Sequence, residues 1–113
     1  MNKNSRRRAY CPVDYAFLRI GGKYKGRILW FLKDGSLRYG ELLRKVEGIS
    51  QKMLTHSLRE LEEDHLVDRK VYLEVPPRVE YSLTDIGSEL IPCIDLLRIW
   101  GIQQMRETEA VQA

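Results

Sequence analysis

The hydrophobic pattern of this chain changes once, near Val67, from a helical period to an alternating one. Two runs of alternating apolar residues follow, one on each side of Pro76-Pro77. Because proline cannot donate a hydrogen bond to a strand ladder, these two residues belong in a connecting loop. The pattern predicts a β-hairpin after a series of helices, and therefore a mainly α fold of the α+β class.

Four helices are predicted before the hairpin, each from apolar residues at three- and four-residue spacings. They cover residues 12–20, 24–32, 36–46 and 50–64, with Ser36 and Ser50 as the expected N-caps of the last two. Only Glu47-Gly48-Ile49 separates Val46 from Ser50, and this spacing is typical of a helix-turn-helix. With the hairpin as its wing, the predicted fold is a winged helix-turn-helix.

A last helix, expected over residues 85–105 with Thr84 as its N-cap, is unusually apolar. Eleven of the twenty positions from Ile86 to Met105 are apolar, more than the stripe that one domain core needs. We therefore predict a homodimer through the first and last helices. Its expected interface residues are Phe17, Ile94, Leu97 and Trp100. Pro92 is expected to bend this helix.

The length of 113 residues fits one domain. We expect a flexible basic arm over residues 1–8, the winged domain over 9–106 with a dimerisation helix over 85–105, and a flexible tail over 107–113. No run approaches the roughly 18 apolar residues of a membrane span, so we expect a cytoplasmic protein without a membrane partner. Two cysteines, Cys11 and Cys93, are too few for a disulfide framework, which favours a reducing compartment.

The net charge of +3 is small, but the basic residues gather near the start of the chain. Residues 1–35 hold nine of the nineteen Lys and Arg and two of the sixteen Asp and Glu. This asymmetry argues against an indiscriminate polycation and allows a local phosphate-binding surface.

The fourth predicted helix has one apolar face and one polar face without an acid between residues 50 and 59. Such a face is often merely solvated, but a turn before it and a hairpin after it favour a helix that reads double-stranded DNA. The candidate DNA-binding residues are Arg38, Ser50, Gln51, Lys52, Thr55, His56, Arg59 and Arg78.

Their side-chain chemistry suggests separate roles. Gln51 and Lys52 are candidates for base contacts, and Thr55 and His56 for base or sugar contacts. Arg59 and Arg38 are expected to meet phosphates, and Arg78, in the wing, phosphate or the minor groove.

Ordered blocks of sequence from Cys11 to about Gly101 resemble the HxlR-type (DUF24) winged-helix regulators, related in architecture to MarR-like proteins. The blocks are Cys11-Pro12, Gly21-Gly22-Lys23-Tyr24, residues 37–42, 48–54, 58–62 and 75–84, and Trp100-Gly101. Tyr24 replaces the usual Trp, and His65 stands where Gly is common. The resemblance implies a homodimeric DNA-binding regulator of an inverted-repeat operator, and on family grounds a repressor.

Cys11 precedes Pro12, so its sulfur is expected at a helix N-terminus, where the dipole favours a thiolate. Several HxlR-type regulators use the cysteine at this position to sense oxidants, quinones or aldehydes, which makes Cys11 a candidate redox sensor. The alternative is a small apolar filler. Cys93 is expected to pack in the core or an interface, and a disulfide between Cys11 and Cys93 of the partner subunit is a hypothesis.

The sequence supports other functions less well. No phosphate loop, HExxH or Gly-x-Ser-x-Gly motif is present, so we predict no enzyme, no catalytic residues and no cofactor. Two Cys and two His without metal-ligand spacing predict no metal site. A regulator controlled by a non-covalent small ligand or metal, with Cys11 structural, stays open. So does a protein-interaction module without DNA binding; the effector is unknown.

Overall fold

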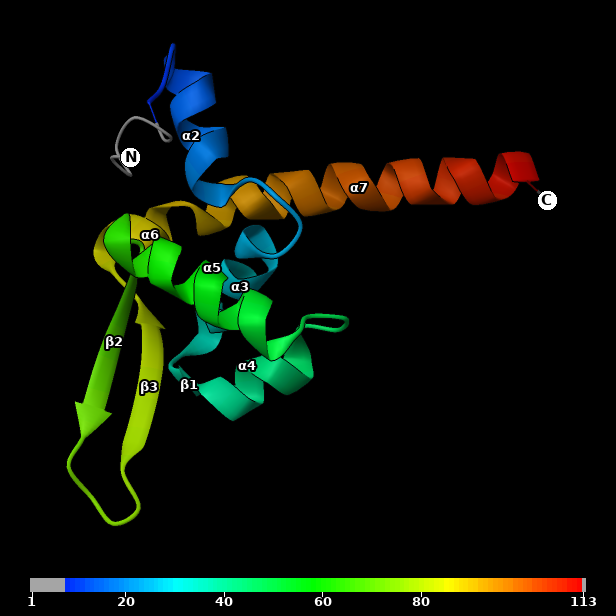
Figure 1. Ribbon diagram of the computed structural model, residues 1–113. Coiled ribbons are helices and arrows are strands. Elements are labelled where there is room, and N and C mark those ends of the chain that lie inside the picture. Colours follow the sequence, from blue (N-terminus) through cyan, green and yellow to red (C-terminus); the bar gives the residue numbers. More distant parts are fainter. Residues whose placement is uncertain (1–7, 113) are drawn as a thin grey trace.

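The computed structural model of the chain describes residues 8–112 (Figure 1). The helices are α2 (Pro12–Ile20), α3 (Lys25–Phe31), α4 (Tyr39–Lys45), α5 (Gln51–Glu63), α6 (Asp85–Glu89) and α7 (Ile91–Gln112), with a 3-10 turn η1 (Leu32–Asp34). The strands are β1 (Leu37–Arg38), β2 (Val67–Tyr72) and β3 (Arg78–Leu83). Of the predicted basic arm, residues 1–7 lie outside the described residues.

The sheet has the order β1-β3-β2, with both pairs antiparallel. Strands β2 and β3 form the predicted hairpin, in register from Val67 opposite Leu83 to Tyr72 opposite Arg78. The short strand β1 adds to the other edge of β3, where Leu37 faces Tyr81. The winged helix-turn-helix architecture predicted from the sequence is therefore confirmed.

The start of the third helix differs from the prediction, because Ser36 is not its N-cap. The segment between Ser36 and α4 is drawn into the sheet as β1, so the helix begins two residues later. Arg38 is its N-cap, and the Arg38 amide donates a hydrogen bond to Glu41 Oε1 (3.0 Å). The Ser36 hydroxyl lies instead 3.4 Å from a carboxylate oxygen of Glu80 on β3.

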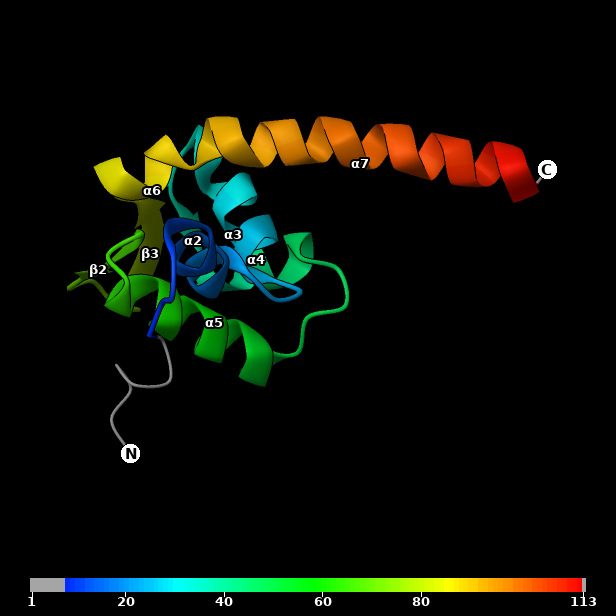
Figure 2. The same cartoon turned by 90° about the horizontal axis from the view of Figure 1, so that it is seen from above.

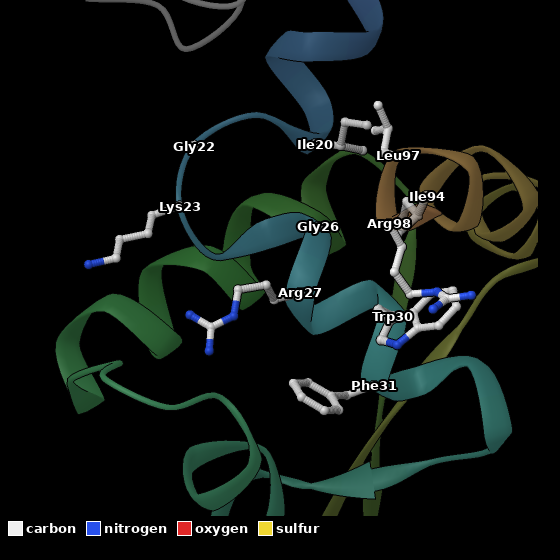
Figure 3. Close-up of a pocket in the computed structure, with 10 residues that line it drawn as sticks. All are labelled: Ile20, Gly22, Lys23, Gly26, Arg27, Trp30, Phe31, Ile94, Leu97 and Arg98. Atoms are coloured by element: carbon white, nitrogen blue, oxygen red, sulfur yellow. The ribbon is translucent and has the colours of Figure 1, made fainter. Parts of the chain in front are cut away.

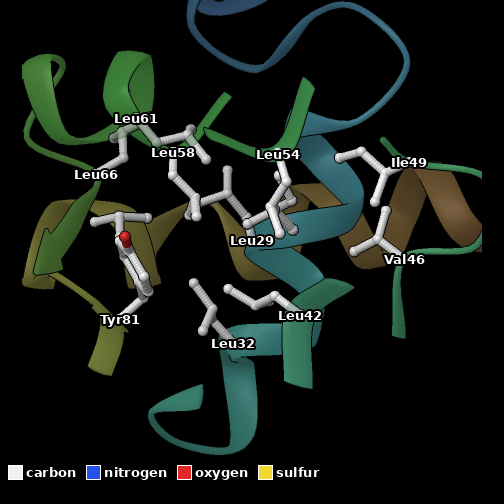
Figure 4. Close-up of a cluster of buried hydrophobic side chains, with 12 residues drawn as sticks. Leu29, Leu32, Leu42, Val46, Ile49, Leu54, Leu58, Leu61, Leu66 and Tyr81 are labelled. Atoms are coloured by element: carbon white, nitrogen blue, oxygen red, sulfur yellow. The ribbon is translucent and has the colours of Figure 1, made fainter. Parts of the chain in front are cut away.

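The core lies where α3, α4 and α5 converge on the base of the hairpin (Figure 4). Helix α5 contributes Leu54, Leu58 and Leu61 from one face, and these pack with Ile28 and Leu29 of α3. The remaining buried apolar residues are Leu32, Leu42, Val46, Ile49, Leu66, Val67 and Tyr81. Burial of one face of α5 leaves the opposite face of that helix toward solvent.

The alternating pattern predicts burial correctly only at the base of the hairpin. Val67 is 2% exposed, whereas Val71, Leu73 and Val75 are 44%, 98% and 102% exposed. The hairpin extends away from the helical body (Figure 1), so no element covers the apolar side chains toward its tip.

Helix α5 ends as expected near Asp64, which is its C-cap. The next residue, His65, has a φ of 61°, in the left-handed region that glycine adopts most easily. The His65 amide donates to the Glu62 carbonyl, and the Leu66 amide to the Leu61 carbonyl, each at 3.0 Å. The Thr84 hydroxyl donates to the His65 carbonyl (2.6 Å) and fixes this turn against the start of α6.

The predicted single helix over residues 85–105 is wrong, because the structure has two helices divided at Leu90. Pro92 is the second residue of α7, where its missing N–H removes no intrahelical bond. The chain therefore breaks before Pro92 rather than bending at it. Helix α7 continues to Gln112, past the predicted helix end at residue 105 and through residues 107–112 of the predicted flexible tail.

Helix α7 extends well past the rest of the molecule toward the C-terminus (Figure 2). The molecule measures 54 × 34 × 26 Å along its principal axes, and the longest dimension runs along helix α7 (Figure 1). Within residues 8–112, no helix is long and apolar enough to cross a membrane.

Candidate nucleic-acid interface

The turn between α4 and α5 is held in place by two side chains from the α3 region. Gly48 has a φ of 82°, which lets the chain reverse without strain. The Tyr24 hydroxyl donates to the Gly48 carbonyl (3.2 Å), and Arg27 donates to the Glu47 carbonyl (3.1 Å). Ser50 caps α5 as predicted, because its hydroxyl accepts a hydrogen bond from the Met53 amide (3.1 Å). The N-terminus of α5 thus has a defined position on the body.

The polar face of α5 brings five of the predicted residues together around one shallow hollow. Gln51, Lys52, His56 and Arg59 are exposed, and Thr55 is half-buried. All five line this hollow, together with Tyr39 of α4. The side chains offer amide, ammonium, hydroxyl, imidazole and guanidinium groups, which can hydrogen-bond base edges and phosphates.

Tyr39 is a residue of this surface that the sequence did not identify. Its hydroxyl donates to the Gln51 carbonyl (2.9 Å) and lies 3.0 Å from the Thr55 hydroxyl. The helical period predicts only that Tyr39 faces inward. A buried phenol needs a polar partner, and this need is the one signal in the sequence that could have drawn attention to Tyr39.

His56 also has a partner within the molecule. Its Nε2 lies 3.0 Å from Glu60 Oε1, and the same oxygen is 3.2 Å from Lys25 Nζ of α3. Glu60, the first acid after the acid-free stretch, therefore contacts the body of the domain through Lys25.

The wing places Arg78 at the first position of β3, beside the connecting loop. Its guanidinium stacks on the Tyr72 ring at 4.0 Å and pairs with Glu74 (3.3 Å) and Glu80 (3.6 Å). Two carboxylates therefore offset the charge of this predicted phosphate contact. Arg38, on β1, is exposed.

Arg69 of β2 is a second cation that the sequence did not identify. It is exposed and lines a further hollow with Thr55, Arg59 and Tyr39. Strand pairing brings this cation beside α5, so its proximity could not be read from helical periodicity.

Cys11 lies at the N-terminus of α2 as predicted, where it is the N-cap, and it is exposed. Its sulfur accepts a hydrogen bond from the Asp14 amide at 3.4 Å. The Asp14 carboxylate in turn accepts one from the Tyr10 amide (2.9 Å). Cys93 is also exposed, so it does not pack in the core of the protomer.

The residues predicted at a dimer interface gather on α2 and α7. Phe17, Leu97 and Trp100 are 59%, 52% and 63% exposed, whereas Ile94 is half-buried. Helix α2 has no buried residue at all. Ile94 and Leu97 line an apolar hollow between α7 and α3, with Ile20 at its rim and Arg98 beside Trp30 (Figure 3).

Within residues 8–112, no three His, Cys, Asp or Glu side chains lie close enough together to hold a metal ion.

Comparison with known proteins identifies the same architecture. The family model described as HxlR-like helix-turn-helix matches residues 19–109. An uncharacterised HTH-type transcriptional regulator of Methanothermobacter thermautotrophicus is 53% identical over 91 residues, which cover 80% of this chain and 70% of that protein.

Two solved structures show a redox regulator, HypR, in different states. The oxidised form has a TM-score of 0.79 and 46% identity, covering 82% of this chain and 96% of that chain. The reduced form has a TM-score of 0.83 and 43% identity, covering 88% and 99%. The relatives are regulators rather than enzymes.

Replacement of Tyr39 by Phe tests the link between α4 and the start of α5. We expect Tyr39→Phe to lower the free energy of unfolding by about 1 kcal/mol, because the hydroxyl bonds to Gln51 and Thr55 are lost. Urea denaturation measures the loss. Tyr15→Phe is the control, since its ring is exposed and no hydroxyl hydrogen bond of Tyr15 occurs within the described residues. Equal effects of both substitutions would contradict the assigned role.

Proposed function

The chain belongs to the HxlR-like helix-turn-helix family and is a transcriptional regulator of the helix-turn-helix type, and we propose that it represses transcription as a homodimer on an inverted-repeat operator. The observation that carries this proposal is the polar face of α5. It presents Gln51, Lys52 and His56 to solvent while the other face forms the core.

In the proposed complex, α5 lies in the major groove with its N-terminal end toward the bases. Gln51 and Lys52 contact base edges, and Thr55 and His56 contact bases or sugars. The acid-free stretch from Ser50 to Arg59 supports this orientation, because Glu60 and the acids after it lie at the other end of the helix.

Phosphate contacts are assigned to Ser50 and Arg59 on α5, Arg38 on β1, and Arg78 in the wing. Arg78 must leave Glu74 and Glu80 to reach a phosphate, so we expect its contribution to be smaller than that of Arg59. Arg69 is added to this set because it lines a hollow with Arg59.

The proposed dimer is formed by α2 and α7, with Phe17, Ile94, Leu97 and Trp100 in its interface. Support comes from the exposed apolar surface of both helices, which includes Val13 at 63%, Leu96 at 69% and Met105 at 65%. A second copy that covered these faces would remove apolar area from water. It would also set two α5 helices about 34 Å apart, one turn of DNA.

We further propose that oxidation of Cys11 regulates DNA binding. The exposed sulfur at the N-terminus of α2 supports this proposal, as do the oxidised and reduced structures of the similar regulator HypR. In the specific form we test, the thiols of Cys11 and of Cys93 of the partner subunit lose two protons and two electrons to an oxidant and form one disulfide. Such a bond would move α2 against α7 and change the spacing of the two α5 helices.

Gln51 and Arg59 should differ in how they affect DNA binding. We expect Gln51→Ala to cost about 1–3 kcal/mol on the operator and to relax preference at one base pair. We expect Arg59→Ala to weaken all sequences similarly and to lower the salt slope by about one unit. Fluorescence anisotropy across a salt series, on operator and random duplexes, separates the two. Indistinguishable behaviour on both duplexes would overturn the assignment of base and phosphate roles.

A charge placed on the proposed dimer face should separate the subunits. We expect Leu97→Asp to shift the sedimentation coefficient from dimer to monomer at micromolar concentration, because an unpaired carboxylate would be buried. Gln103→Glu is the control, since it adds a charge at another exposed position of α7. A dimer that survives Leu97→Asp unchanged would show that this face is not the interface.

The redox proposal is tested by adding diamide, which accepts two electrons and two protons from thiols, before DNA binding is measured. We expect the wild-type affinity to change and Cys11→Ser to abolish that change. An unaltered response in Cys11→Ser would refute sensing by Cys11. On non-reducing gels, a dimer band that persists in Cys93→Ser would refute only the pairing with Cys93.

A further inference from the structure

One carboxylate joins the exposed face of α5 to the buried start of α3. Glu60 Oε1 lies 3.0 Å from His56 Nε2 on the same helix and 3.2 Å from Lys25 Nζ on α3. The side chains of Lys25 and Glu60 are 11% and 15% exposed, whereas that of His56 is 54% exposed. We call these three residues the Glu60 bridge.

The Glu60 bridge restrains a side chain that would otherwise rotate freely on the helix surface. A partly buried ion pair is screened by water less than an exposed one, so Lys25 holds the Glu60 carboxylate in a defined place. His56, one turn before Glu60, is then held through its Nε2. The ring is therefore fixed relative to the domain body as well as to its own helix.

The contact also determines which hydrogen bond remains available at the other ring nitrogen of His56, Nδ1. An ionised carboxylate only accepts hydrogen bonds, so Nε2 carries the proton in the bond to Glu60. In the neutral ring Nδ1 is then an acceptor, and in the protonated ring Nδ1 becomes a donor. An acceptor pairs with the amino group of adenine or cytosine, whereas a donor pairs with guanine N7 or O6, adenine N7 or thymine O4.

We propose that Glu60 is a positioning residue for DNA recognition, which holds His56 so that Nδ1 reads one base pair in each half-site and so that protonation changes the preferred base. This inference rests on the proposed function. It assigns sequence selectivity to a residue that does not itself touch DNA.

Charged groups of both signs surround His56. Glu60 is the acid in contact with the ring, and Lys25 lies behind Glu60 on α3. Lys52 and Arg59 line the same hollow as His56.

The experiment selects binding sites from a pool of random DNA duplexes of about 30 base pairs, enough for two half-sites one helical turn apart. The full-length wild type, Glu60→Gln, His56→Ala and the control Glu63→Gln are each selected at about pH 8 and about pH 5.5, on either side of the usual histidine titration. Glu63→Gln removes one negative charge at an exposed position of the same helix. Thermal melting establishes that each variant is folded.

At pH 8, we expect the wild type and Glu63→Gln to select the same motif. We expect Glu60→Gln and His56→Ala to lose roughly fivefold or more of the discrimination at one shared position per half-site, with the other positions retained. For the wild type at pH 5.5, we expect the preference at that position to change from a base that offers an amino group toward one that offers only acceptors there, guanine or thymine, and His56→Ala to show no change.

Each contrary outcome has a separate meaning. If the wild type selects no motif, the proposed sequence-specific function fails, and this inference with it. If the wild type selects a motif that Glu60→Gln leaves intact, the function stands and the positioning role is wrong. If Glu60→Gln does not fold, the pH comparison of wild type with His56→Ala still decides, since an identical wild-type motif at both pH values refutes the inference.

Discussion

Burial of one face of α5 is the interaction on which the rest of the structure depends. Leu54, Leu58 and Leu61 pack with Leu29 of α3 and with the apolar residues of α4. A helix that buries one face must turn its other face outward, so the core itself presents Gln51 to solvent. The proposed DNA-binding surface is in this sense a consequence of packing.

Hydrogen bonds at the start of α5 define the position of this helix more accurately than hydrophobic packing does. Packing is non-directional and tolerates small rotations of a helix, whereas hydrogen bonds fix distance and direction. The bonds from Tyr24 to Gly48 and from Tyr39 to Gln51 therefore define where the helix begins relative to the body. Near the other end of α5, the ion pair between Glu60 and Lys25 links the helix to α3. Readout of base edges needs this accuracy, because each contact depends on hydrogen-bond geometry.

The opposite side of the molecule carries apolar surface that the protomer does not use. Helix α2 buries no residue, and α7 extends beyond the body with Trp100 and Met105 exposed. In the proposed dimer this surface joins the two DNA-reading units, so whatever changes the packing of α2 on α7 changes their separation. Cys11 at the N-terminus of α2 is well placed to do this.

Local sequence patterns predicted the order of the helices as far as α5, the turn at Gly48, the hairpin and the polar face of α5, but not the division of the last helix at Leu90. These features depend on local backbone preferences and on periods within one element, which are properties of neighbouring residues. For the same reason the sequence correctly predicted Ser50 as an N-cap.

Packing between elements set the features that involve residues far apart in the chain. Leu37 became a strand because β3 lay beside it, and Ser36 lost its expected capping role. Val71 and Leu73 stayed exposed because the hairpin reaches beyond the body. Tyr39, Arg69 and Lys25 joined α5 through contacts with other elements. Periodicity reports which way a side chain faces along its own element, but which group it meets depends on how the elements pack.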